Sequence, residues 1–382
     1  MVTRHPRRFR VVGLSAAGQH VEQLADQVRL LKPARVAVPT EEAGQALRLM
    51  LADQQTKIPT ILTGQDASTK LARAGADVVL NAITGFAGLE PTLATLAAGS
   101  VLALANKESL VVGGPLVKKA AKPGQIVPVD SEHSAIAQSL RSGRAKEVNR
   151  LILTASGGPF RGRTRDQLRG VTVEQALHHP TWQMGRVVTI NSSTLVNKGL
   201  ELIEAALLFD VPWDRIQVVV HPQSMVHSMV EFRDGSTIAQ CSPPDMRLPI
   251  ALGLSWPRRL GNVAQACDWS TPSAWTFEPL DNDTFPAVEL ARRVGQFGGT
   301  APATFNAANE ECVDAFCEGA ILFTDIVDIV TEVVEQAMAA PDEQPTDQKH
   351  QQNKKQKLTV EQIRTADAWA RRTAQEAIGR RA

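Results

Sequence analysis

The segment Gln125-Ile126-Val127-Pro128-Val129-Asp130-Ser131-Glu132-His133 decides how the chain is interpreted. Its first five residues are mostly apolar, which predicts a buried strand. Asp130 and Glu132 then follow the carboxyl end of that strand, where open α/β sheets build their binding sites. Carboxylate oxygens suit magnesium or manganese better than zinc. The segment therefore predicts a site for a hard cation at the edge of a parallel sheet.

A second segment, residues 191–201, adds a carboxylate, hydroxyls, an amide and an ammonium group. Asn197 and Glu201 are one helical turn apart and share a face, and Lys198 lies three residues before Glu201. One helix would then offer a metal ligand and a clamp for an anion such as a sugar phosphate. The alternative stays open at this point: Asp130 and Ser131 would cap a helix, and Lys198 and Glu201 would form a solvated ion pair.

Length, charge and composition set wider bounds. With 382 residues the chain exceeds one typical core, so two or three domains are expected. A formal charge of +1 argues against a nucleic-acid partner. No signal peptide or membrane span is recognised, and the cysteines form no CxxC pair. We expect a cytoplasmic protein with free thiols and no membrane partner.

Short apolar runs alternate with helical patterns through the first third of the chain. The predicted strands are 9–14, 35–38, 60–62, 78–83 and 101–105, and the predicted helices include 21–31 and 41–52. This alternation predicts an α/β fold with a parallel, doubly wound sheet.

The remaining two thirds change character. Predicted strands at 151–154, 216–220, 228–232 and 237–240 indicate a central α+β domain. Helical patterns at 287–294, 303–318, 324–339 and 360–378 predict a small C-terminal bundle. Residues 340–357 offer almost nothing apolar to bury and are predicted to form a disordered insertion.

Several strings of residues resemble the 1-deoxy-D-xylulose 5-phosphate reductoisomerase family, in that family's order and spacing. They are Leu-Ala-Asn-Lys-Glu-Ser-Leu at 104–110, Val-Asp-Ser-Glu-His at 129–133, Ala-Ser-Gly-Gly-Pro-Phe at 155–160, His-Pro-Thr-Trp-Gln-Met-Gly at 179–185, Asn-Lys-Gly-Leu-Glu at 197–201 and His-Pro-Gln-Ser at 221–224. The resemblance runs almost end to end. It implies an NADP-dependent oxidoreductase and isomerase that converts 1-deoxy-D-xylulose 5-phosphate to 2-C-methyl-D-erythritol 4-phosphate, in the non-mevalonate route to isoprene units. It also implies a homodimer.

The resemblance assigns roles to individual residues. Carboxylates that would hold Mg²⁺, Mn²⁺ or Co²⁺ are Asp130, Glu132 and Glu201, and with Lys107 they form the expected catalytic set. The sugar would be contacted by Lys107, Ser131, Glu132 and Glu201. The phosphate would be bound by Ser156, His179, Ser192, Asn197 and Lys198. The residues that would cover the substrate or line the nicotinamide region are Trp182, Met184, Pro244 and Met246.

Taken singly, some of these residues have simpler interpretations. Ser156, Gly157 and Gly158 suit an ordinary turn. His179 alone would be read as a structural histidine, and Trp182 as a core residue. The surrounding motifs favour the functional interpretation in each case.

The cofactor half departs from the family pattern. A Gly-x-Thr-Gly-x-x-Gly turn, whose glycines let a pyrophosphate approach a helix, is missing from the sequence. The first strand, this turn and most of the first helix have no counterpart. A doubly wound sheet without its central strand would leave two neighbouring strands unpaired or forced together. The remaining candidates for NADPH contacts are Gly18, Gln19, His20, Asn106, Glu108 and Gly185.

Two hypotheses follow from the missing turn. In the first, Met1 is a wrongly chosen start and the native product extends upstream. In the second, the chain is a non-enzymatic remnant that binds metal and phosphosugar but has lost NADPH. The expected division has four parts: a Rossmann-like NADPH-binding domain without its first βα unit at 1–129, a catalytic metal- and substrate-binding domain at 130–256, a connector at 257–286 and the helical domain at 287–382.

Overall fold

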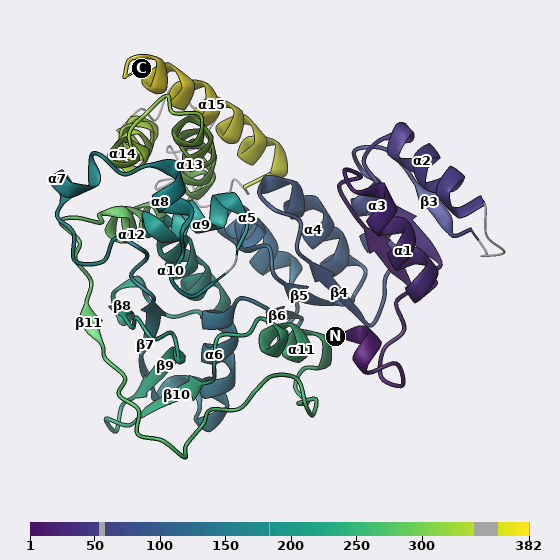
Figure 1. The fold of residues 1–382 in the computed structure, drawn as a ribbon, viewed down its shortest axis with the longest axis horizontal. Helices are drawn as coiled ribbons and strands as arrows, with labels where there is room; N and C mark the ends of the chain where they lie inside the picture. Colours follow the sequence, from purple (N-terminus) through teal and green to yellow (C-terminus); the bar gives the residue numbers. More distant parts are fainter. Residues whose placement is uncertain (53–57, 183, 340–357, 382) are drawn as a thin grey trace. The chain divides into compact units, whose positions relative to one another are not determined.

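The computed structural model describes residues 1–52, 58–182, 184–339 and 358–381, which form two compact units (Figure 1). Unit 1 contains Met1–Asn106, Lys119–Val129 and Arg247–Val263, and unit 2 contains Lys107–Lys118, Asp130–Met246 and Ala264–Ala382. The predicted disordered insertion at 340–357 lies outside the described residues. Among the helices that the structure describes, none has both the length and the apolar character needed to cross a membrane.

Unit 1 holds two three-stranded parallel sheets. One has the order β1-β2-β3 and the other β4-β5-β6. The strands are β1 (Gly13–Ser15), β2 (Arg35–Ala37), β3 (Thr60–Leu62), β4 (Val78–Asn81), β5 (Val101–Leu104) and β6 (Ile126–Pro128). The helices are α1 (Val21–Leu31), α2 (Glu41–Ala52), α3 (Ala67–Arg73), α4 (Leu89–Ala97) and α11 (Arg247–Ser255), with short 3-10 turns at Val2–Arg4 and Phe86–Gly88.

The alternating α/β pattern predicted for this part is confirmed, but the sheet is divided. Within the described residues β1 pairs only with β2, and β4 pairs only with β5, so each has one unpaired edge. Of the two expected outcomes for a sheet without a central strand, the structure shows the unpaired one. The first strand was also predicted too long: it begins at Gly13, not Phe9, and has three residues, like its partner β2.

The helices of unit 1 form because one face of each is apolar. In α1 the buried positions are Leu24, Ala25 and Val28, at the spacing of a single helical face. They pack in one cluster with Val36 of β2 and Leu47 of α2. This burial holds the loop before α1 beside the first sheet.

Unit 2 is built on a mixed five-stranded sheet of order β10-β9-β7-β8-β11. β7 pairs in parallel with β8 and antiparallel with β9. The strands are β7 (Val148–Ala155), β8 (Ile216–Val220), β9 (Val226–Phe232), β10 (Thr237–Cys241) and β11 (Glu278–Pro279). The predicted α+β character of this part is confirmed.

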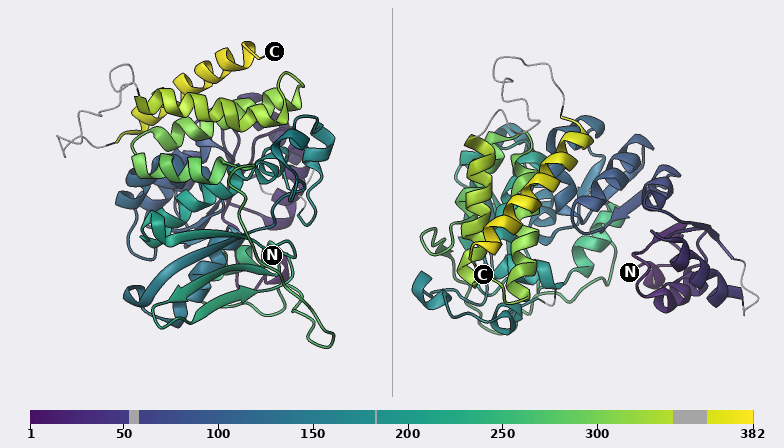
Figure 2. Two further views of the ribbon diagram at one scale, coloured as in Figure 1. Left: turned by 90° about the vertical axis from the view of Figure 1, so that its left-hand side faces the viewer. Right: turned by 90° about the horizontal axis from the view of Figure 1, so that it is seen from above.

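Helices complete unit 2, and the C-terminal helices lie above the sheet in the left view of Figure 2. The helix α5 (Lys107–Ala120) begins in unit 2, and the others before the bundle are α6 (Ser131–Ser139), α7 (Arg165–Leu168), α8 (Val173–Leu177), α9 (Arg186–Ser193) and α10 (Val196–Phe209). The 3-10 turns are Leu140–Ser142, Ala145–Glu147 and Trp213–Arg215. The C-terminal bundle consists of α12 (Ala287–Phe297), α13 (Ala301–Cys317), α14 (Phe323–Ala339) and α15 (Val360–Gly379).

The predicted bundle is confirmed, and it supports the helix that carries the second motif. Most of α13 is buried, and it packs against α14 and α15. A neighbouring contact joins α12 to α10, where a side chain at Gly199 would lie 2.8 Å from the Cβ of Ala291 and 3.0 Å from the carbonyl oxygen of Ala287. The glycine therefore allows the close approach that fixes α10 in place.

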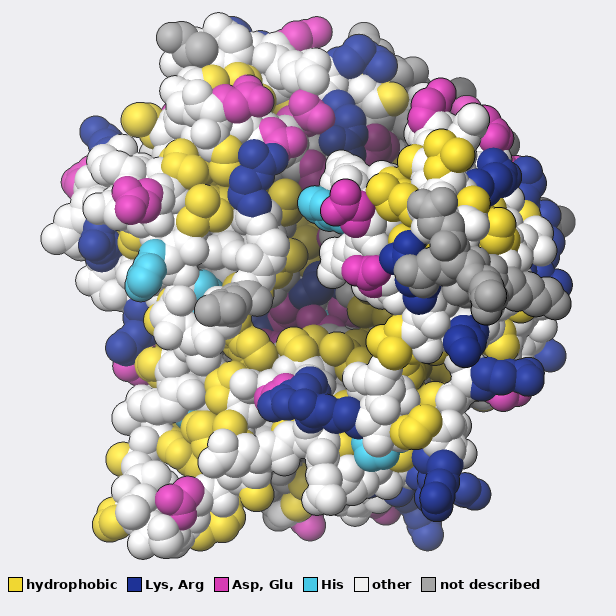
Figure 3. All heavy atoms as spheres, turned by 45° about the vertical axis from the view of Figure 1, so that its right-hand side comes forward, with side chains coloured by type: hydrophobic (Ala, Val, Ile, Leu, Met, Phe, Trp, Pro, Cys, Tyr) yellow, Lys and Arg dark blue, Asp and Glu magenta, His cyan; other side chains and the backbone are white. Residues whose placement is uncertain are grey.

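The surface carries charges of both signs. On the face drawn in Figure 3, Lys and Arg side chains lie in separate groups among acidic and apolar ones. This mixture agrees with the formal charge of +1.

Candidate functional site

Three carboxylates predicted as metal ligands meet in unit 2. Asp130 is the N-cap of α6, Glu132 lies in its first turn and Glu201 projects from α10. One oxygen of each lies within 4.8 Å of the others. The Oδ1 atom of Asp130 also accepts hydrogen bonds from the backbone N–H groups of Glu132 and His133 at 3.1 and 3.4 Å. The capping predicted as a simpler alternative is therefore present, and it orients a member of the cluster.

Two lysines lie between these carboxylates. The Nζ atom of Lys107 is 2.9 Å from Oδ2 of Asp130 and 2.8 Å from Oε1 of Glu201. The Nζ atom of Lys198 is 2.7 Å from Oε1 of Glu132 and also contacts Glu201. The side chains of Lys198 and Glu201 are only 5% and 2% exposed. The alternative of a solvated ion pair is therefore wrong.

Burial and mutual charge shift the pKa values in this cluster. Burial would raise the pKa of Asp130, but the positive charges of Lys107 and His133 hold it well below its ordinary value. Burial would likewise lower the pKa of Lys107, but the carboxylates of Asp130 and Glu201 raise it well above its ordinary value. This part of the cluster is therefore charged at neutral pH.

Glu132 behaves differently. Burial, followed by the nearby charge of Glu201, raises its pKa to about 7, although Lys198 opposes the shift. Burial and repulsion from Glu201 thus oppose the ionisation of Glu132. An oxygen-only set of this kind fits Mg²⁺ or Mn²⁺, because these ions prefer oxygen ligands and would offset that repulsion.

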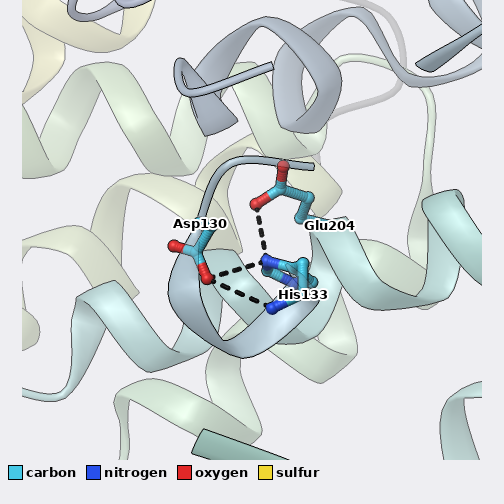
Figure 4. Close-up of side chains that lie close together, drawn as sticks. All are labelled: Asp130, His133 and Glu204. Carbon is cyan, nitrogen blue, oxygen red and sulfur yellow. Dashed lines mark hydrogen bonds and ion pairs between the residues drawn. The ribbon is translucent and has the colours of Figure 1, made fainter. Parts of the chain in front are cut away.

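Two residues beside the cluster were given no role by the sequence interpretation. His133 and Glu204 are both fully buried. Figure 4 shows the carboxylates of Asp130 and Glu204 beside the imidazole ring of His133. Burial would lower the pKa of His133, but the charges of Glu204 and Asp130 raise it to about 9. The signal that could have identified Glu204 is an acidic residue inside an otherwise apolar helical stretch, three positions after Glu201.

A second polar group contains residues predicted to bind phosphate. The Nδ1 atom of His179 accepts hydrogen bonds from the backbone N–H groups of Thr181 and Trp182 at 3.0 and 2.8 Å. The proton must then lie on Nε2, which donates to the hydroxyl oxygen of Ser156 at 3.1 Å. Burial lowers the pKa of His179, which favours this neutral form.

The Ser156 hydroxyl oxygen also accepts a hydrogen bond from the backbone N–H of Gly158 at 3.2 Å. Gly157 and Gly158 both have positive φ, which a side chain would strain. A side chain at Gly158 would also lie 3.0 Å from the carbonyl oxygen of Ser192. Residues 156–158 form an irregular segment just before a turn that begins at Pro159, and Gly158 lies close to the end of α9.

The structure links two more predicted substrate residues to the carboxylate cluster. Ser131 donates a hydrogen bond to Glu132, and the amide oxygen of Asn197 accepts one from Lys107 at 2.9 Å. Asn197 also donates to Glu201. Helix α10 therefore presents Asn197, Lys198 and Glu201 to one site, as the helical spacing predicted.

The residues expected to cover the substrate have fewer described contacts with the rest of the site. Trp182 is half-buried, and its ring centroid lies 6.2 Å from that of His227. Met184 and Pro244 are half-buried, and Met246 is 38% exposed. Among the described residues no hydrogen bond or ion pair joins Met184, Pro244 or Met246 to the carboxylate cluster.

The expected cofactor residues are divided between the units. Unit 1 contains Gly18, Gln19 and His20 in the loop before α1, and Asn106 after β5, while Glu108 and Gly185 belong to unit 2. Gly18 has a φ of 81°, and His20 makes no side-chain capping bond at the start of α1. Backbone N–H groups at that helix start suit a phosphate group. Asn106 is buried and donates to the carbonyl of Gly85 at 3.2 Å.

Comparisons with known proteins agree along the whole chain. The 1-deoxy-D-xylulose 5-phosphate reductoisomerase profile matches residues 1–114, its C-terminal domain profile matches residues 126–209, and the DXP reductoisomerase C-terminal domain profile matches residues 241–373. A protein of Cutibacterium acnes named 1-deoxy-D-xylulose 5-phosphate reductoisomerase is 62% identical, over 98% of this chain and 93% of its own length. One of the same name from Kitasatospora griseola is 60% identical, over 98% and 95%.

Solved structures of such enzymes share the fold. A DOX-P reductoisomerase in complex with NADPH, fosmidomycin and magnesium has a TM-score of 0.89 and 36% identity, over 99% of this chain and 94% of that one. The 1-deoxy-D-xylulose 5-phosphate reductoisomerase from Zymomonas mobilis in complex with NADPH has a TM-score of 0.87 and 37% identity, with the same coverage.

Proposed function

This chain belongs to the 1-deoxy-D-xylulose 5-phosphate reductoisomerase family, and we propose on that premise that it converts 1-deoxy-D-xylulose 5-phosphate to 2-C-methyl-D-erythritol 4-phosphate with NADPH. The observation that carries the proposal is the convergence of Asp130, Glu132 and Glu201 with Lys107 and Lys198 in one buried cluster. A neutral core of similar size would need no such group of charges.

Asp130, Glu132 and Glu201 would hold the divalent metal, for which Mg²⁺, Mn²⁺ and Co²⁺ are the candidates. When bound, the ion would act as a Lewis acid on the hydroxyl and carbonyl oxygens of the substrate. The chain's own contribution is to hold these oxygen ligands in place: the α6 backbone orients Asp130, and the close packing of α10 on α12 fixes Glu201.

Lys107 supplies a fixed positive charge in the same cluster. Its ammonium group is held by Asp130 and Glu201, so it needs no rearrangement when negative charge develops on the substrate. Ser131 lies on the same cluster and would contact the sugar. Together these groups favour the rearrangement of the carbon skeleton.

The phosphate would bind at Ser156, His179, Ser192, Asn197 and Lys198. The Ser156 oxygen already accepts hydrogen bonds from Gly158 and His179, so its own proton can be donated to an anion. Binding of the unreactive phosphate would hold the reacting carbons in position. In favourable reactions such positioning lowers the activation barrier by up to about 7–11 kcal/mol.

NADPH would supply the hydride for the reduction. Gly18, Gln19, His20, Asn106, Glu108 and Gly185 are the residues proposed to contact it, and the uncapped start of α1 suits one of its phosphates. Trp182 and Met184 would exclude water from the substrate, and Pro244 and Met246 would line the nicotinamide region. Relatives of the same name at 60–62% identity over 98% of the chain favour the enzyme over the non-enzymatic remnant.

The finer assignments stay predictions. We propose a cytoplasmic homodimer without nucleic-acid or membrane partners, and a division into 1–129, 130–256, 257–286 and 287–382. Size measurement of the purified protein by light scattering tests the dimer.

The function is tested by mixing purified chain, 1-deoxy-D-xylulose 5-phosphate, Mg²⁺ and NADPH and following NADPH absorbance. Substrate-dependent oxidation is expected, and Asp130→Asn should abolish it while the exposed control Asp234→Asn leaves it unchanged. Metal and phosphosugar binding without any NADPH binding would instead establish the remnant.

A further inference from the structure

The imidazole ring of His133 connects the two segments that carry the carboxylate cluster. The ring is fully buried, and its Nε2 atom lies 2.8 Å from the backbone carbonyl oxygen of Glu201. A carbonyl can only accept a hydrogen bond, so Nε2 carries a proton. The Nδ1 atom lies 3.0 Å from Oδ1 of Asp130. One ring therefore contacts the residue at the start of α6 and the backbone of α10.

This arrangement determines which oxygen of Asp130 faces the cluster. Oδ1 is engaged by His133 and by the backbone of α6, whereas Oδ2 lies 2.9 Å from Lys107. Rotation of the carboxylate would break the contacts at Oδ1. His133 thus fixes the side chain of Asp130 and the backbone of Glu201 at the same time.

Glu204 is a second carboxylate beside the same ring nitrogen that Asp130 contacts, as Figure 4 shows. Its Oε2 atom lies 3.2 Å from Nδ1 of His133, and the residue is 0% exposed. Within the described part of the chain, neither of its carboxylate oxygens has a hydrogen-bond partner of good geometry. A buried carboxyl without such partners costs free energy, so its presence in α10 calls for a compensating role.

We propose that Glu204 is a positioning residue of the metal centre, which acts through His133 to hold Asp130 and Glu201 in ligand geometry. The inference rests on the proposed function, because it requires a divalent ion at Asp130, Glu132 and Glu201. Partners of this kind behind metal ligands typically change metal affinity or activity about 10- to 100-fold when removed. Glu204 is not one of the three proposed metal ligands, so its effect on them would pass through His133.

The test is Mn²⁺ titration, read by the electron paramagnetic resonance signal of free Mn²⁺, on the full chain and on Glu204→Ala. The variant is expected to bind Mn²⁺ about 10- to 100-fold more weakly and to recover its turnover at saturating Mn²⁺. Glu204→Gln, which keeps the shape and one acceptor, is expected to fall between the two. Glu231→Gln, at a partly exposed ion pair with Arg150, is the matched control and should bind as the unaltered chain does.

The possible outcomes are distinct. If Glu204→Ala does not fold, Glu204→Gln decides, and unchanged affinity there overturns the proposal. Unchanged affinity in a folded Glu204→Ala also overturns it, as does binding of a second Mn²⁺ that is lost in the variant, because Asp130, His133 and Glu204 would then form a metal site of their own. Absence of Mn²⁺ binding by the unaltered chain would contradict the metal centre of the proposed function instead.

Discussion

The ammonium group of Lys107 lies 2.8 Å from the Oε1 atom of Glu201, although 94 positions separate the two residues in the chain. The contact joins the start of α5 to the middle of α10. Because Lys107 also contacts Asp130, one positive charge stabilises two predicted metal ligands. Loss of the Lys107 charge should therefore affect the rate of the reaction and the affinity for the metal in different ways.

Lys107→Gln should lower kcat/KM by about 100- to 1,000-fold, the range typical of losing one preorganised group that stabilises a developing oxyanion. Mn²⁺ affinity should be retained or rise, because Asp130 and Glu201 no longer share a competing ammonium group. Steady-state kinetics and Mn²⁺ titration check this. Lys118→Gln, at an exposed pair with Asp210, is the control. Parallel loss of activity and metal binding would contradict the assigned role.

Lys198→Met should destabilise the metal-free protein by about 3–5 kcal/mol, because Glu132 and Glu201 would remain buried without this counter-charge. Saturating Mn²⁺ should recover part of that loss. Urea denaturation with and without Mn²⁺ measures both effects. Lys118→Met should change stability by about 1 kcal/mol or less. Equal effects of the two substitutions would show that burial of the Lys198 pair is unimportant.

His227 should make stability depend on pH. Burial lowers its pKa below 6.5, assisted by His221 and Lys198, while its bond to Ser242 and the charge of Asp130 oppose the shift. Above pH 6.5 the ring is neutral in both folded and unfolded chains. As the pH falls below that value, the unfolded chain gains a proton first, so this contribution to stability is lost.

Replacement of His227 by Gln should therefore reduce the fall in unfolding free energy between about pH 7 and about pH 5. Urea denaturation at both pH values measures it, and the exposed His178→Gln serves as control. An unchanged pH dependence in His227→Gln would count against a neutral buried ring.

Gly158→Ala should raise KM for the phosphorylated substrate, because the new Cβ would lie 3.0 Å from the Ser192 carbonyl oxygen and 3.2 Å from the Ser193 Cα. Those backbone atoms must move, and Ser192 moves with them. Gly162→Ala is a matched control, since it also has positive φ but nothing within 4 Å of the added carbon. Both should lose about 1–2 kcal/mol of stability, because a side chain disfavours positive φ. Only Gly158→Ala should change KM. An equal KM in both variants would show that the approach of Gly158 to the Ser192 backbone does not affect substrate binding.

Local pattern was enough to predict many elements. The helices at 21–31 and 41–52 and the strand at 216–220 have the predicted bounds, because apolar spacing within one element is written in neighbouring residues. The first strand was misjudged, because its length depends on a partner strand rather than on its own apolar run. The division of the unit 1 sheet likewise depends on which strands pair.

The site shows the same limit. Motif and spacing selected Asp130, Glu132, Lys198 and Glu201, which the structure brings together. They did not select His133 and Glu204, because the contact of His133 with the Glu201 carbonyl joins residues 68 positions apart. The solvated interpretation of Lys198 was equally open until its burial was known.

By itself, the sequence determined the family, the α/β character of the N-terminal part and the residue types of the candidate site, since each depends on local order along the chain. Only the tertiary structure decided that Lys107 and Lys198 lie between the carboxylates and that one imidazole joins α6 to α10. It also decided that β1 and β4 each have one unpaired edge among the strands described. The physical reason is that burial and charge pairing arise between elements distant in sequence, so no single segment specifies them.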